Sequence, residues 1–457
     1  MTFESGARVH FVGIGGAGMS AIAKVLHERG VAISGSDLKR STPMTMLEAM
    51  GVAVHVGHSA ELVEGADVVV ASSAIPESNP ELRRAVELGT QVMTRGEALA
   101  EVLRGRRSIV VAGTHGKTTT TSMIVSILHR CDMDPTYLIG AGLNDAGTNA
   151  RHGRDDVVVA ESDESDGSFL LLSPSVAVVT NVEQDHVDFW HSLDEITNAF
   201  DDFMRRVEPE GTVVVPAGDA DLVTRASATG RQVVRFGHDG DVWADAVDLH
   251  ASGASFDLCA GEGRQHVALR VPGTHNVGNA LAAAGACLQL GAPLDRVAAG
   301  LCDYRGVQRR WQTKGSARDV TVIDDYAHHP TEIRATLAAA RPGPWRRIVA
   351  VFQPHRYSRT AAFARDFGRS FEGADRVVVM DVYGAGEEPV PGVSGKLVAD
   401  AICAALPGRP VAYLPHRGEV VEYLVRGARS GDALFTLGAG DVTALGDEVL
   451  ERLGAGA

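Results

Sequence analysis

The chain has 457 residues and a formal net charge of −15 at pH 7. Hydrophobic residues make up 45% of it and charged residues 22%, a globular composition that excludes a disordered, collagen-like or coiled-coil protein. The acidic charge argues against nucleic acid or an anionic membrane as a partner, because such binding depends largely on Lys and Arg that release counterions.

The length predicts about three domains, at roughly 150 residues each, and we assign residues 1–106 to the first. Short β-branched runs occur at residues 9–12, 31–33 and 67–71, with helical patterns between them. This alternation of strand and helix predicts a parallel sheet.

A glycine-rich turn follows the first of these strands and opens a helix. It has the sequence GIGGAG at residues 13–18, and Asp37 stands at the end of the second strand. Glycines let backbone N–H groups and a helix N-terminus approach a diphosphate, and a ribose or base would meet the acidic residue. The motif alone does not separate NAD from another diphosphate such as a UDP-sugar, and a tight turn without a ligand is the structural alternative.

The second domain, residues 107–312, contains a further series of strands. We expect them at residues 108–112, 157–160, 176–180 and 211–215, followed by a helix of small residues from 276 to about 290. Residues 230–271 alternate apolar and polar positions with many glycines. That pattern predicts antiparallel hairpins set on this domain.

A second phosphate-binding loop follows the first strand of this domain, with the sequence GTHGKTTT at residues 113–120. Lys117 is placed to reach β- and γ-phosphate oxygens, and the Thr118 hydroxyl to ligate Mg²⁺ at a helix N-terminus. Val111 stands where the general Walker pattern has glycine. The chain has only five lysines, so a lysine here favours a phosphate cradle over an ordinary turn. Two phosphate sites on consecutive domains indicate a transfer enzyme.

Metal ligands are expected at the carboxyl ends of the neighbouring strands. Glu161 directly follows one strand and opens an acidic cluster at residues 161–166, and His186 lies after the next strand beside further acidic residues. The alternatives are a solvated acidic loop for the cluster and a loop histidine with ordinary hydrogen bonds for His186.

The third domain, residues 313–457, is again a strand and helix series. Its strands are expected at residues 320–323, 347–352, 376–380, 411–414 and 433–437. Asp325 and His328 follow the first of these, and a glycine loop at residues 438–441, a turn or a weak substrate contact, follows the last.

Arg356 and Arg359 follow the second strand of this domain, three residues apart. This spacing puts both guanidinium groups on one face of a helix start and suits recognition of a carboxylate or phosphate. The alternative is a salt bridge between domains.

Nine motifs, in order along nearly the whole chain, resemble the Mur ligase family. They are GIGGAGM (13–19), GTHGKTTT (113–120), AESDES (160–165), TNVEQDHVD (180–188), HNVGN (275–279), RRWQ (309–312), DDYAHHPTE (324–332), QPHRYSRT (353–360) and LGAGD (437–441). The first motif, together with DDYAHHPTE and QPHRYSRT, is similar to the alanine-adding branch of the family.

The resemblance implies an α/β protein of three domains. A Rossmann-like N-terminal domain would bind the UDP part. A central P-loop ATPase-like domain would have a mostly parallel sheet with an antiparallel addition, and a Rossmann-like C-terminal domain would close over ATP and the amino acid. The implied reaction belongs to peptidoglycan precursor synthesis. The lactyl carboxylate of UDP-N-acetylmuramate takes the γ-phosphoryl group of ATP, and the amine of L-alanine attacks the acyl phosphate to give an amide, ADP and phosphate.

The resemblance also implies roles for individual residues. The UDP-sugar would meet Gly13, Gly15, Gly16, Ala17, Gly18, Met19, Asp37 and Ser73. ATP would meet Gly113, Thr114, His115, Gly116, Lys117, Thr118, Thr119, His275, Asn276, Asn279, Arg310 and Asp325. Thr118 and Glu161 would hold one Mg²⁺ and His186 a second. The catalytic set would be Lys117, Glu161, His186, His328, Arg356 and Arg359, the last three at the amino acid.

One departure from the family concerns a carbamylated lysine that several relatives use at the second Mg²⁺. No lysine lies between Lys117 and Lys314, so this chain cannot form that carbamate in its central domain. Asp201 and Asp202 lie on the helical stretch where relatives place the lysine.

Three other functions compete with this interpretation. A murein tripeptide-recycling ligase shares most motifs and the same UDP-sugar. An NAD-dependent oxidoreductase would explain the first glycine motif only, and a non-catalytic nucleotide-switched protein would turn over ATP slowly.

Location and assembly are predicted less directly. No apolar run approaches the length of a membrane span and the opening residues lack a secretory pattern, so we expect a cytoplasmic protein. The five cysteines are an odd number without the spacing of a zinc or disulfide framework and are expected to be reduced thiols in the core. A monomer and a dimer are both compatible with the sequence.

Overall fold

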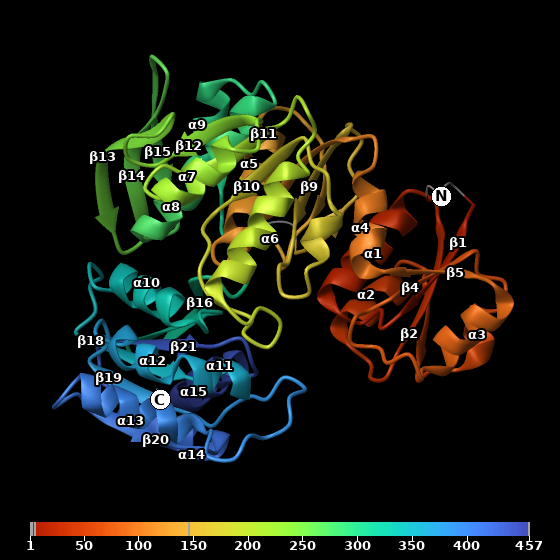
Figure 1. Cartoon of the computed structure of the whole chain (residues 1–457). Coiled ribbons are helices and arrows are strands. Elements are labelled where there is room, and N and C mark those ends of the chain that lie inside the picture. The colour runs from red at the N-terminus through yellow and green to blue at the C-terminus, as the bar shows by residue number, and fades with distance from the viewer. Residues whose placement is uncertain (1–2, 4–5, 145–146, 456–457) are drawn as a thin grey trace.

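The structure, a computed structural model, describes residue 3 and residues 6–144 and 147–455. It contains three sheets, of five, ten and six strands, each formed by one continuous part of the chain. Figure 1 shows the three α/β units, with the N-terminal one to the right and the C-terminal one below the central one. The predicted α/β fold with three domains is confirmed, whereas the limits at residues 106 and 312 remain predictions.

The N-terminal sheet is entirely parallel, in the order β3-β2-β1-β4-β5. Its strands are β1 (Arg8–Val12), β2 (Ala32–Asp37), β3 (Ala53–Val56), β4 (Val68–Ala71) and β5 (Gln91–Thr94). Its helices are α1 (Ala17–Glu28), α2 (Thr42–Ala49), the 3₁₀ helix η1 (Ala60–Val63), α3 (Pro80–Leu88) and α4 (Arg95–Leu103). The strand order reverses between β1 and β4, which opens a ligand crevice at their carboxyl ends.

Local sequence accounts for the boundaries of these helices. The Asn79 side chain accepts hydrogen bonds from two backbone N–H groups at the start of α3, and Pro80 occupies its first turn. Gly89 ends the same helix with φ +68°, a left-handed conformation that glycine adopts without strain. Thr94 and Glu97 form a capping box at the start of α4.

The central sheet has the order β15-β14-β13-β12-β11-β10-β6-β9-β7-β8. Its strands are β6 (Arg107–Ala112), β7 (Thr136–Leu138), β8 (Ala150–Arg151), β9 (Val157–Glu161), β10 (Val176–Val179), β11 (Thr212–Pro216), β12 (Gln232–Phe236), β13 (Val242–His250), β14 (Gly253–Ala260) and β15 (Gly263–Leu269). Its helices are α5 (Lys117–Arg130), η2 (Ser168–Leu171), α6 (Leu193–Arg205), α7 (Ala220–Ser227), α8 (Thr274–Gln289) and α9 (Leu294–Asp303). The strand β6 lies between β9 and β10, so the loops after these three strands meet at one edge.

The predicted antiparallel hairpins begin later than expected. β12 pairs in parallel with β11, and within this segment the antiparallel pairs are those of β13 with β14 and of β14 with β15. The expectation that hairpins start at Gly230 is therefore wrong, because an alternating strand shows which face is buried but not the direction of its partner.

The C-terminal sheet has the order β16-β17-β21-β18-β19-β20 and is parallel except for the edge strand β16. Its strands are β16 (Gln312–Ala317), β17 (Val320–Asp325), β18 (Arg347–Phe352), β19 (Arg376–Val379), β20 (Val411–Tyr413) and β21 (Asp432–Leu437). Its helices are α10 (Pro330–Ala340), α11 (Tyr357–Ala362), α12 (Ala364–Ser370), α13 (Gly395–Ala405), α14 (Arg417–Gly427) and α15 (Thr443–Ala455).

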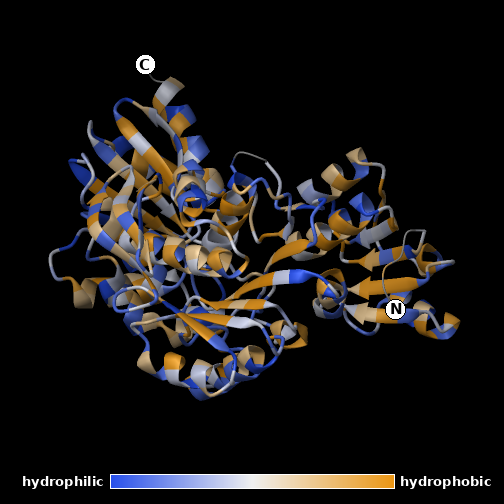
Figure 2. Ribbon diagram, turned by 90° about the horizontal axis from the view of Figure 1, so that it is seen from above, coloured by the Kyte–Doolittle hydropathy of each residue, from blue (hydrophilic) through white to orange (hydrophobic). Residues whose placement is uncertain are grey.

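Buried apolar strands form the core of each unit. Residues 109–112 of β6 and 157–160 of β9 are wholly inaccessible to solvent, as expected where helices cover both faces of a parallel sheet. Figure 2 shows that many strands of the molecule are coloured hydrophobic, whereas helices and loops carry more hydrophilic residues. Within the described part of the chain, no helix has both the length and the apolar character that crossing a bilayer requires. All five cysteines are free thiols, but the expectation that they lie in the core is correct only for Cys259 and Cys287, since Cys131 and Cys302 are half-buried and Cys403 is exposed.

Candidate active site

The loop between β6 and α5 has the geometry of a phosphate cradle. Gly113 and Gly116 have φ of +130° and +82°, which bends the loop so that α5 begins at Lys117. The Lys117 ammonium donates hydrogen bonds to the carbonyl of Gly113 at 2.6 Å and to both carboxylate oxygens of Glu164, at 3.0 and 2.8 Å. Burial lowers the pKa of Lys117, but the charges of Glu164 and Asp163 outweigh it and raise the pKa above its ordinary value.

Two of the three predicted metal ligands lie against each other beside this lysine. The Thr118 hydroxyl donates a hydrogen bond to Glu161 at 2.8 Å, and the Gly140 N–H donates to the other Glu161 oxygen at 2.6 Å. Burial raises the pKa of Glu161.

The third predicted ligand, His186, contacts Glu164, the residue that also binds Lys117. Its Nε2 lies 3.2 Å from a Glu164 oxygen, while its Nδ1 is buried without a hydrogen-bond partner among the described residues. Asp163, Glu164 and His186 offer ligand atoms within 4.8 Å of one another. Glu164 is completely buried. Sequence reasoning placed it in an acidic cluster but gave it no role, because only the fold shows which carboxylate faces Lys117.

A cavity of about 300 Å³ lies next to the cradle, between the central and C-terminal units. Nine of the residues predicted for ATP line it: His115, Gly116, Thr118, Thr119, His275, Asn276, Asn279, Arg310 and Asp325. Other lining residues were not predicted, among them Thr180, Asn181, Glu183, Phe236, Tyr304, Trp311, Thr331 and Glu332. The motif TNVEQDHVD, which was assigned only to metal, contains three of these.

Charged groups from both units meet at the edge of this cavity. Arg310 donates a hydrogen bond to Glu332 at 3.2 Å, and His115 Nδ1 lies 3.5 Å from the same carboxylate oxygen. Burial lowers the pKa of His115, but contacts with Glu183 and Glu332 outweigh this effect and raise the pKa to about 9. Burial raises the pKa of Asp325 to about 6. Glu332 also accepts hydrogen bonds from the backbone N–H groups of His328 and His329, the capping-box position three residues after the helix cap.

The predicted amino-acid residues Arg356 and Arg359 form salt bridges between domains. Arg359 binds Asp185 through two hydrogen bonds of 2.9 and 3.1 Å, with both side chains buried. Arg356 donates to Asp188 at 2.7 Å. The structure therefore contains the salt bridges between domains that were the alternative interpretation of this pair. A role of the two arginines in binding the amino acid remains a prediction.

His328 lies close to this pair of arginines. Its ring stacks edge-on against His355 with 5.8 Å between centroids, and Arg359 contacts His355 at 3.3 Å. Burial lowers the pKa of His328 to about 3, so the ring is neutral.

The first glycine turn lies at the crevice between β1 and β4. Gly13 has φ +85°, and its N–H donates to the carbonyl of Ser36 at 2.8 Å. The Gly15 N–H donates to the Asp37 carboxylate at 3.0 Å, which joins two predicted residues. Gly16, Ala17, Gly18 and Ser73 are exposed, whereas the Met19 side chain is buried in the core. Any contact of Met19 with a ligand would therefore be made by its backbone.

Arg95 was not predicted and links this turn to the acidic loop. It donates hydrogen bonds to Asp166 and Ser168, both at 2.9 Å, and a side chain at Gly18 would lie 3.3 Å from it. Its position at the start of α4 gives no motif, so the sequence carried no signal for it.

Comparisons with family models cover most of the chain. The model described as "Mur ligase family, catalytic domain" matches residues 8–107, "Mur ligase middle domain" matches residues 111–287, and "Mur ligase, glutamate ligase domain" matches residues 309–440.

Individual proteins give a finer comparison. The UDP-N-acetylmuramate–L-alanine ligase of Mycolicibacterium smegmatis is 47% identical, with 98% of this chain and 95% of that protein aligned. The enzyme of the same name from Saccharopolyspora erythraea is 48% identical over 98% and 93%. The solved UDP-N-acetylmuramate-alanine ligase of Thermotoga maritima superposes with a TM-score of 0.82 at 30% identity, over 98% of this chain and all of that one. A murein peptide ligase of Psychrobacter arcticus superposes with a TM-score of 0.73 at 26% identity, over 98% and 99%.

Proposed function

The chain belongs to the Mur ligase family, and on that premise we propose that it is an ATP-dependent ligase that joins L-alanine to the lactyl carboxylate of UDP-N-acetylmuramate. The names of relatives that align with 98% of the chain at 45–48% identity support this substrate pair. Peptidoglycan precursor synthesis is the process that follows from these substrates, and the cytoplasm, where ATP and UDP-sugars are available, is the compartment we propose.

One observation carries the proposal: the phosphate cradle that contains Lys117 borders a cavity that two domains share, and Gly116 and Thr118, on either side of the lysine, line that cavity. Lys117 and Thr118 come from the central unit, and Arg310, Asp325 and Glu332 close the cavity from the other side. Such an arrangement binds a nucleotide between domains and points its phosphates at the lysine. The separate glycine turn after β1 leaves a second phosphate site for the UDP-sugar.

The residues around Lys117 fit Mg²⁺. The site offers hydroxyl and carboxylate oxygens from Thr118 and Glu161, together with a buried imidazole of His186 whose Nδ1 has no partner among the described residues. Oxygen donors with few protein ligands are what Mg²⁺ prefers. We propose that Thr118 and Glu161 hold one ion and His186 a second; when bound, Mg²⁺ would offset charge on the phosphate oxygens.

The reaction then needs two steps at one place. A carboxylate oxygen of the UDP-sugar attacks the γ-phosphorus of ATP, the bond to the β-phosphate oxygen breaks, and ADP leaves. The amine of L-alanine then attacks the carbonyl carbon of the acyl phosphate, loses a proton and expels phosphate. Lys117 supplies a fixed positive charge to the transferred group, and Glu164 holds the ammonium in position.

The amino-acid pocket is proposed at His328, Arg356 and Arg359. His328 is neutral and buried, and the two arginines are the cations that a carboxylate requires. Because Asp185 and Asp188 already pair with these arginines, the amino acid would share them or displace a carboxylate.

Measuring phosphate release with UDP-N-acetylmuramate, ATP and L-alanine, each omitted in turn, tests the function. Release should require all three. Replacing L-alanine by the tripeptide L-Ala-D-Glu-diaminopimelate separates the recycling ligase: phosphate release with the tripeptide, and none with L-alanine, would overturn the proposed acceptor. Release that needs only ATP would indicate a nucleotide switch, and a substrate-dependent change in nicotinamide absorbance would indicate an oxidoreductase.

A further inference from the structure

A group of metal-ligating side chains lies apart from the proposed Mg²⁺ ligands, where the central and C-terminal units meet. His115 and Glu183 come from the central unit and His329 from the start of α10. Each offers one ligand atom, and these atoms lie within 4.8 Å of one another. His329 is 4% exposed, whereas His115 and Glu183 are partly exposed.

The distances suit a small metal ion. His115 Nε2 lies 3.5 Å and His329 Nδ1 4.0 Å from the same Glu183 oxygen. Two ligands at about 2.0–2.1 Å from a tetrahedral Zn²⁺ lie about 3.3–3.4 Å apart. The separation of His115 from Glu183 is close to this value, and that of His329 from Glu183 must shorten by about 0.6–0.7 Å.

Both imidazole rings have a nitrogen that forms no hydrogen bond within the described part of the chain. Nε2 of His115 and Nε2 of His329 are both buried without a hydrogen-bond partner among the described residues. Buried polar atoms ordinarily find partners, so the unpartnered Nε2 of His115, the atom that faces Glu183, points to a missing ligand. The His329 ring lies beside it, with centroids 4.7 Å apart, and turns its Nδ1, not its unpartnered Nε2, toward Glu183.

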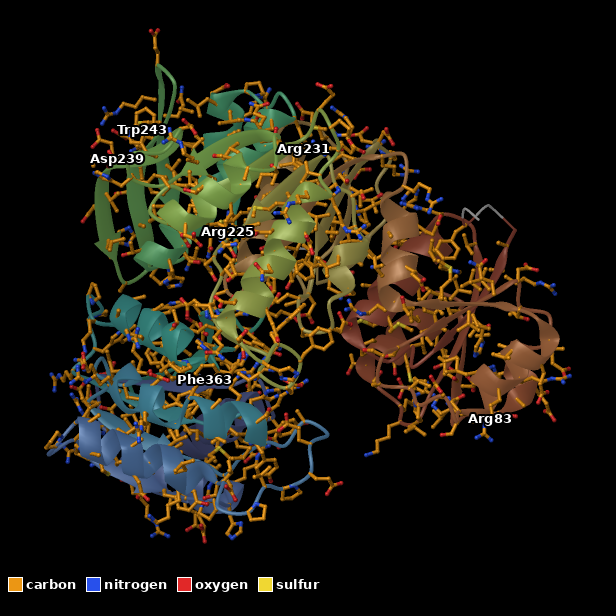
Figure 3. All side chains as sticks on the ribbon, in the orientation of Figure 1. Arg83, Arg225, Arg231, Asp239, Trp243 and Phe363 are labelled. Atoms are coloured by element: carbon orange, nitrogen blue, oxygen red, sulfur yellow. The ribbon has the colours of Figure 1, made fainter. Side chains whose placement is uncertain are left out.

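Neighbouring groups would support coordination. Glu332 lies 3.5 Å from Nδ1 of His115, the carboxylate–histidine arrangement that orients metal-binding imidazoles. The Thr331 hydroxyl donates to the Glu183 oxygen at 2.7 Å. Phe363, labelled in Figure 3, packs edge-on against the His329 ring at 4.9 Å and forms an apolar wall.

We propose that His115, Glu183 and His329 form a binding site for a divalent transition metal of the Zn²⁺ class, which ties the phosphate loop to the C-terminal domain. Two imidazoles and one carboxylate are a donor set for Zn²⁺, Co²⁺ or Ni²⁺, whereas Mg²⁺ prefers oxygen. The metal takes the place of the proton on His115. Coordination through Nδ1 of His329 replaces the 3.3 Å hydrogen bond that this atom accepts from the Thr331 N–H.

The site has a consequence for the nucleotide. His115 stands two residues before Lys117, and both His115 and Glu183 line the nucleotide cavity. An ion that joins them to His329 holds the two domains together across that cavity. Zn²⁺ therefore inhibits turnover by slowing nucleotide entry and release.

Cobalt provides a readout that does not depend on activity. The full-length protein is titrated with Co²⁺ in excess Mg²⁺, and the visible absorption of four-coordinate Co²⁺ is followed. One equivalent should give the band, and one equivalent of Zn²⁺ should remove it. Excess Mg²⁺ competes with Co²⁺ for the proposed Mg²⁺ ligands Thr118, Glu161 and His186.

Variants assign the signal to the three residues. His329→Gln and Glu183→Gln should each lose the band and weaken Zn²⁺ binding at least tenfold. His266→Gln is the matched control, because His266 forms an exposed pair with Asp257 at 3.0 Å without a third ligand, and it should behave as the unmodified protein. A band that survives in both His329→Gln and Glu183→Gln overturns the site, as does absence of any band in the unmodified protein.

A second measurement covers the case in which a variant folds poorly. Release of a fluorescent ATP analogue from the unmodified protein is timed with and without one equivalent of Zn²⁺, then after addition of a zinc-selective chelator. Slowing of several-fold that the chelator reverses supports the proposal. Unchanged release overturns the link between the domains, independently of whether the ligase reaction itself is confirmed.

Discussion

The Lys117 ammonium lies between both carboxylate oxygens of Glu164, at 3.0 and 2.8 Å, with Glu164 completely buried. Breaking such a pair leaves an uncompensated buried charge, so the carboxylate keeps the lysine in one position. The protein's own contacts therefore hold the lysine in the phosphate cradle, without any contribution from a substrate.

Lys117→Ala should abolish amide formation and leave binding of UDP-N-acetylmuramate largely intact, because the UDP-sugar turn lies on another domain. Loss of one preorganised donor costs about 10²–10³ in kcat, and a full positive charge should cost at least as much. Phosphate release and calorimetric binding of the UDP-sugar measure the two effects. Lys396→Ala is the control, since Lys396 forms an ion pair with Asp400 on an exposed helix face. An equal loss of UDP-sugar affinity in Lys117→Ala would contradict the division between domains.

Gly15→Val should raise KM for the UDP-sugar and affect ATP little. A Cβ at Gly15 would lie 2.7 Å from the Ser41 hydroxyl and 2.8 Å from the Asp37 carboxylate, so the contact between the turn and β2 must break. Gly418→Ala, on α14 of the C-terminal unit, is the control, because a Cβ there meets nothing within 4 Å. Steady-state kinetics with each substrate varied decide the matter, and similar constants for Gly15→Val and Gly418→Ala would refute the prediction.

Arg359→Lys should weaken the contact between the central and C-terminal domains and raise KM for L-alanine. An ammonium does not reproduce the two-pronged contact with Asp185, and a lost hydrogen bond to a charged group costs about 1.5–3 kcal/mol. Constants for ATP and the UDP-sugar should move less.

Asp185→Asn separates the two roles of that arginine. In a double-mutant cycle on thermal stability, Arg359→Lys and Asp185→Asn should be less than additive. If Arg359 binds the acceptor carboxylate, only the arginine variant should raise KM for L-alanine. A main effect on ATP instead would reassign the arginine to phosphate stabilisation.

The N-terminal domain should lose stability in acid, because the stabilising contribution of the ionised Glu81 is lost there. Glu81 accepts hydrogen bonds from the Ser36 hydroxyl at 2.6 Å and the Ser59 N–H at 3.1 Å, and it lies 3.3 Å from His10. Burial opposes ionisation, yet the hydrogen bonds from His10 and Ser36 hold the pKa of Glu81 below its ordinary value of 4.5. A depressed carboxyl pKa contributes stability that is present above the unfolded value and is lost as pH falls through the folded one.

Hydrogen exchange checks this prediction. Peptides from β1 and β2, corrected for intrinsic rates, should lose protection between about pH 5 and about pH 3. Glu81→Gln should lower protection at neutral pH by about 1–3 kcal/mol and flatten the acid dependence. Glu87→Gln, on the exposed face of the same helix, is the control. A Glu81→Gln variant with the acid dependence of the unmodified protein would show that another group is responsible.

Activity should be indifferent to carbon dioxide, because no lysine lies between Lys117 and Lys314 to be carbamylated. Asp201 and Asp202, on α6, accept hydrogen bonds from Arg225 at 2.8 Å and Arg205 at 2.9 Å, and Arg225 comes from α7 (Figure 3). Rates in degassed, bicarbonate-free buffer and with added bicarbonate should agree. His186→Ala should lower turnover and the dependence on a second Mg²⁺, with the exposed His191→Ala as control. Reversible several-fold activation by bicarbonate would show the prediction to be wrong.

Much of the site was predictable because it depends on local sequence. The strand before Gly113, the positive φ of Gly113 and Gly116, and the start of α5 at Lys117 are consequences of residues that adjoin in the chain. The same holds for the turn at Gly13. Helical and extended periods also predicted most of the strands, since buried parallel strands are continuous apolar runs.

Tertiary structure decided which side chains face one another. Glu164 pairs with Lys117 because β6 lies between β9 and β10, an order that brings loops 47 residues apart into contact. Arg359 meets Asp185 across 174 residues, and Glu332 reaches His115 from another domain. The direction of β12 was likewise set by its partner β11. A sequence period specifies the buried face of an element, whereas the pairing of two elements depends on the packing of the whole chain.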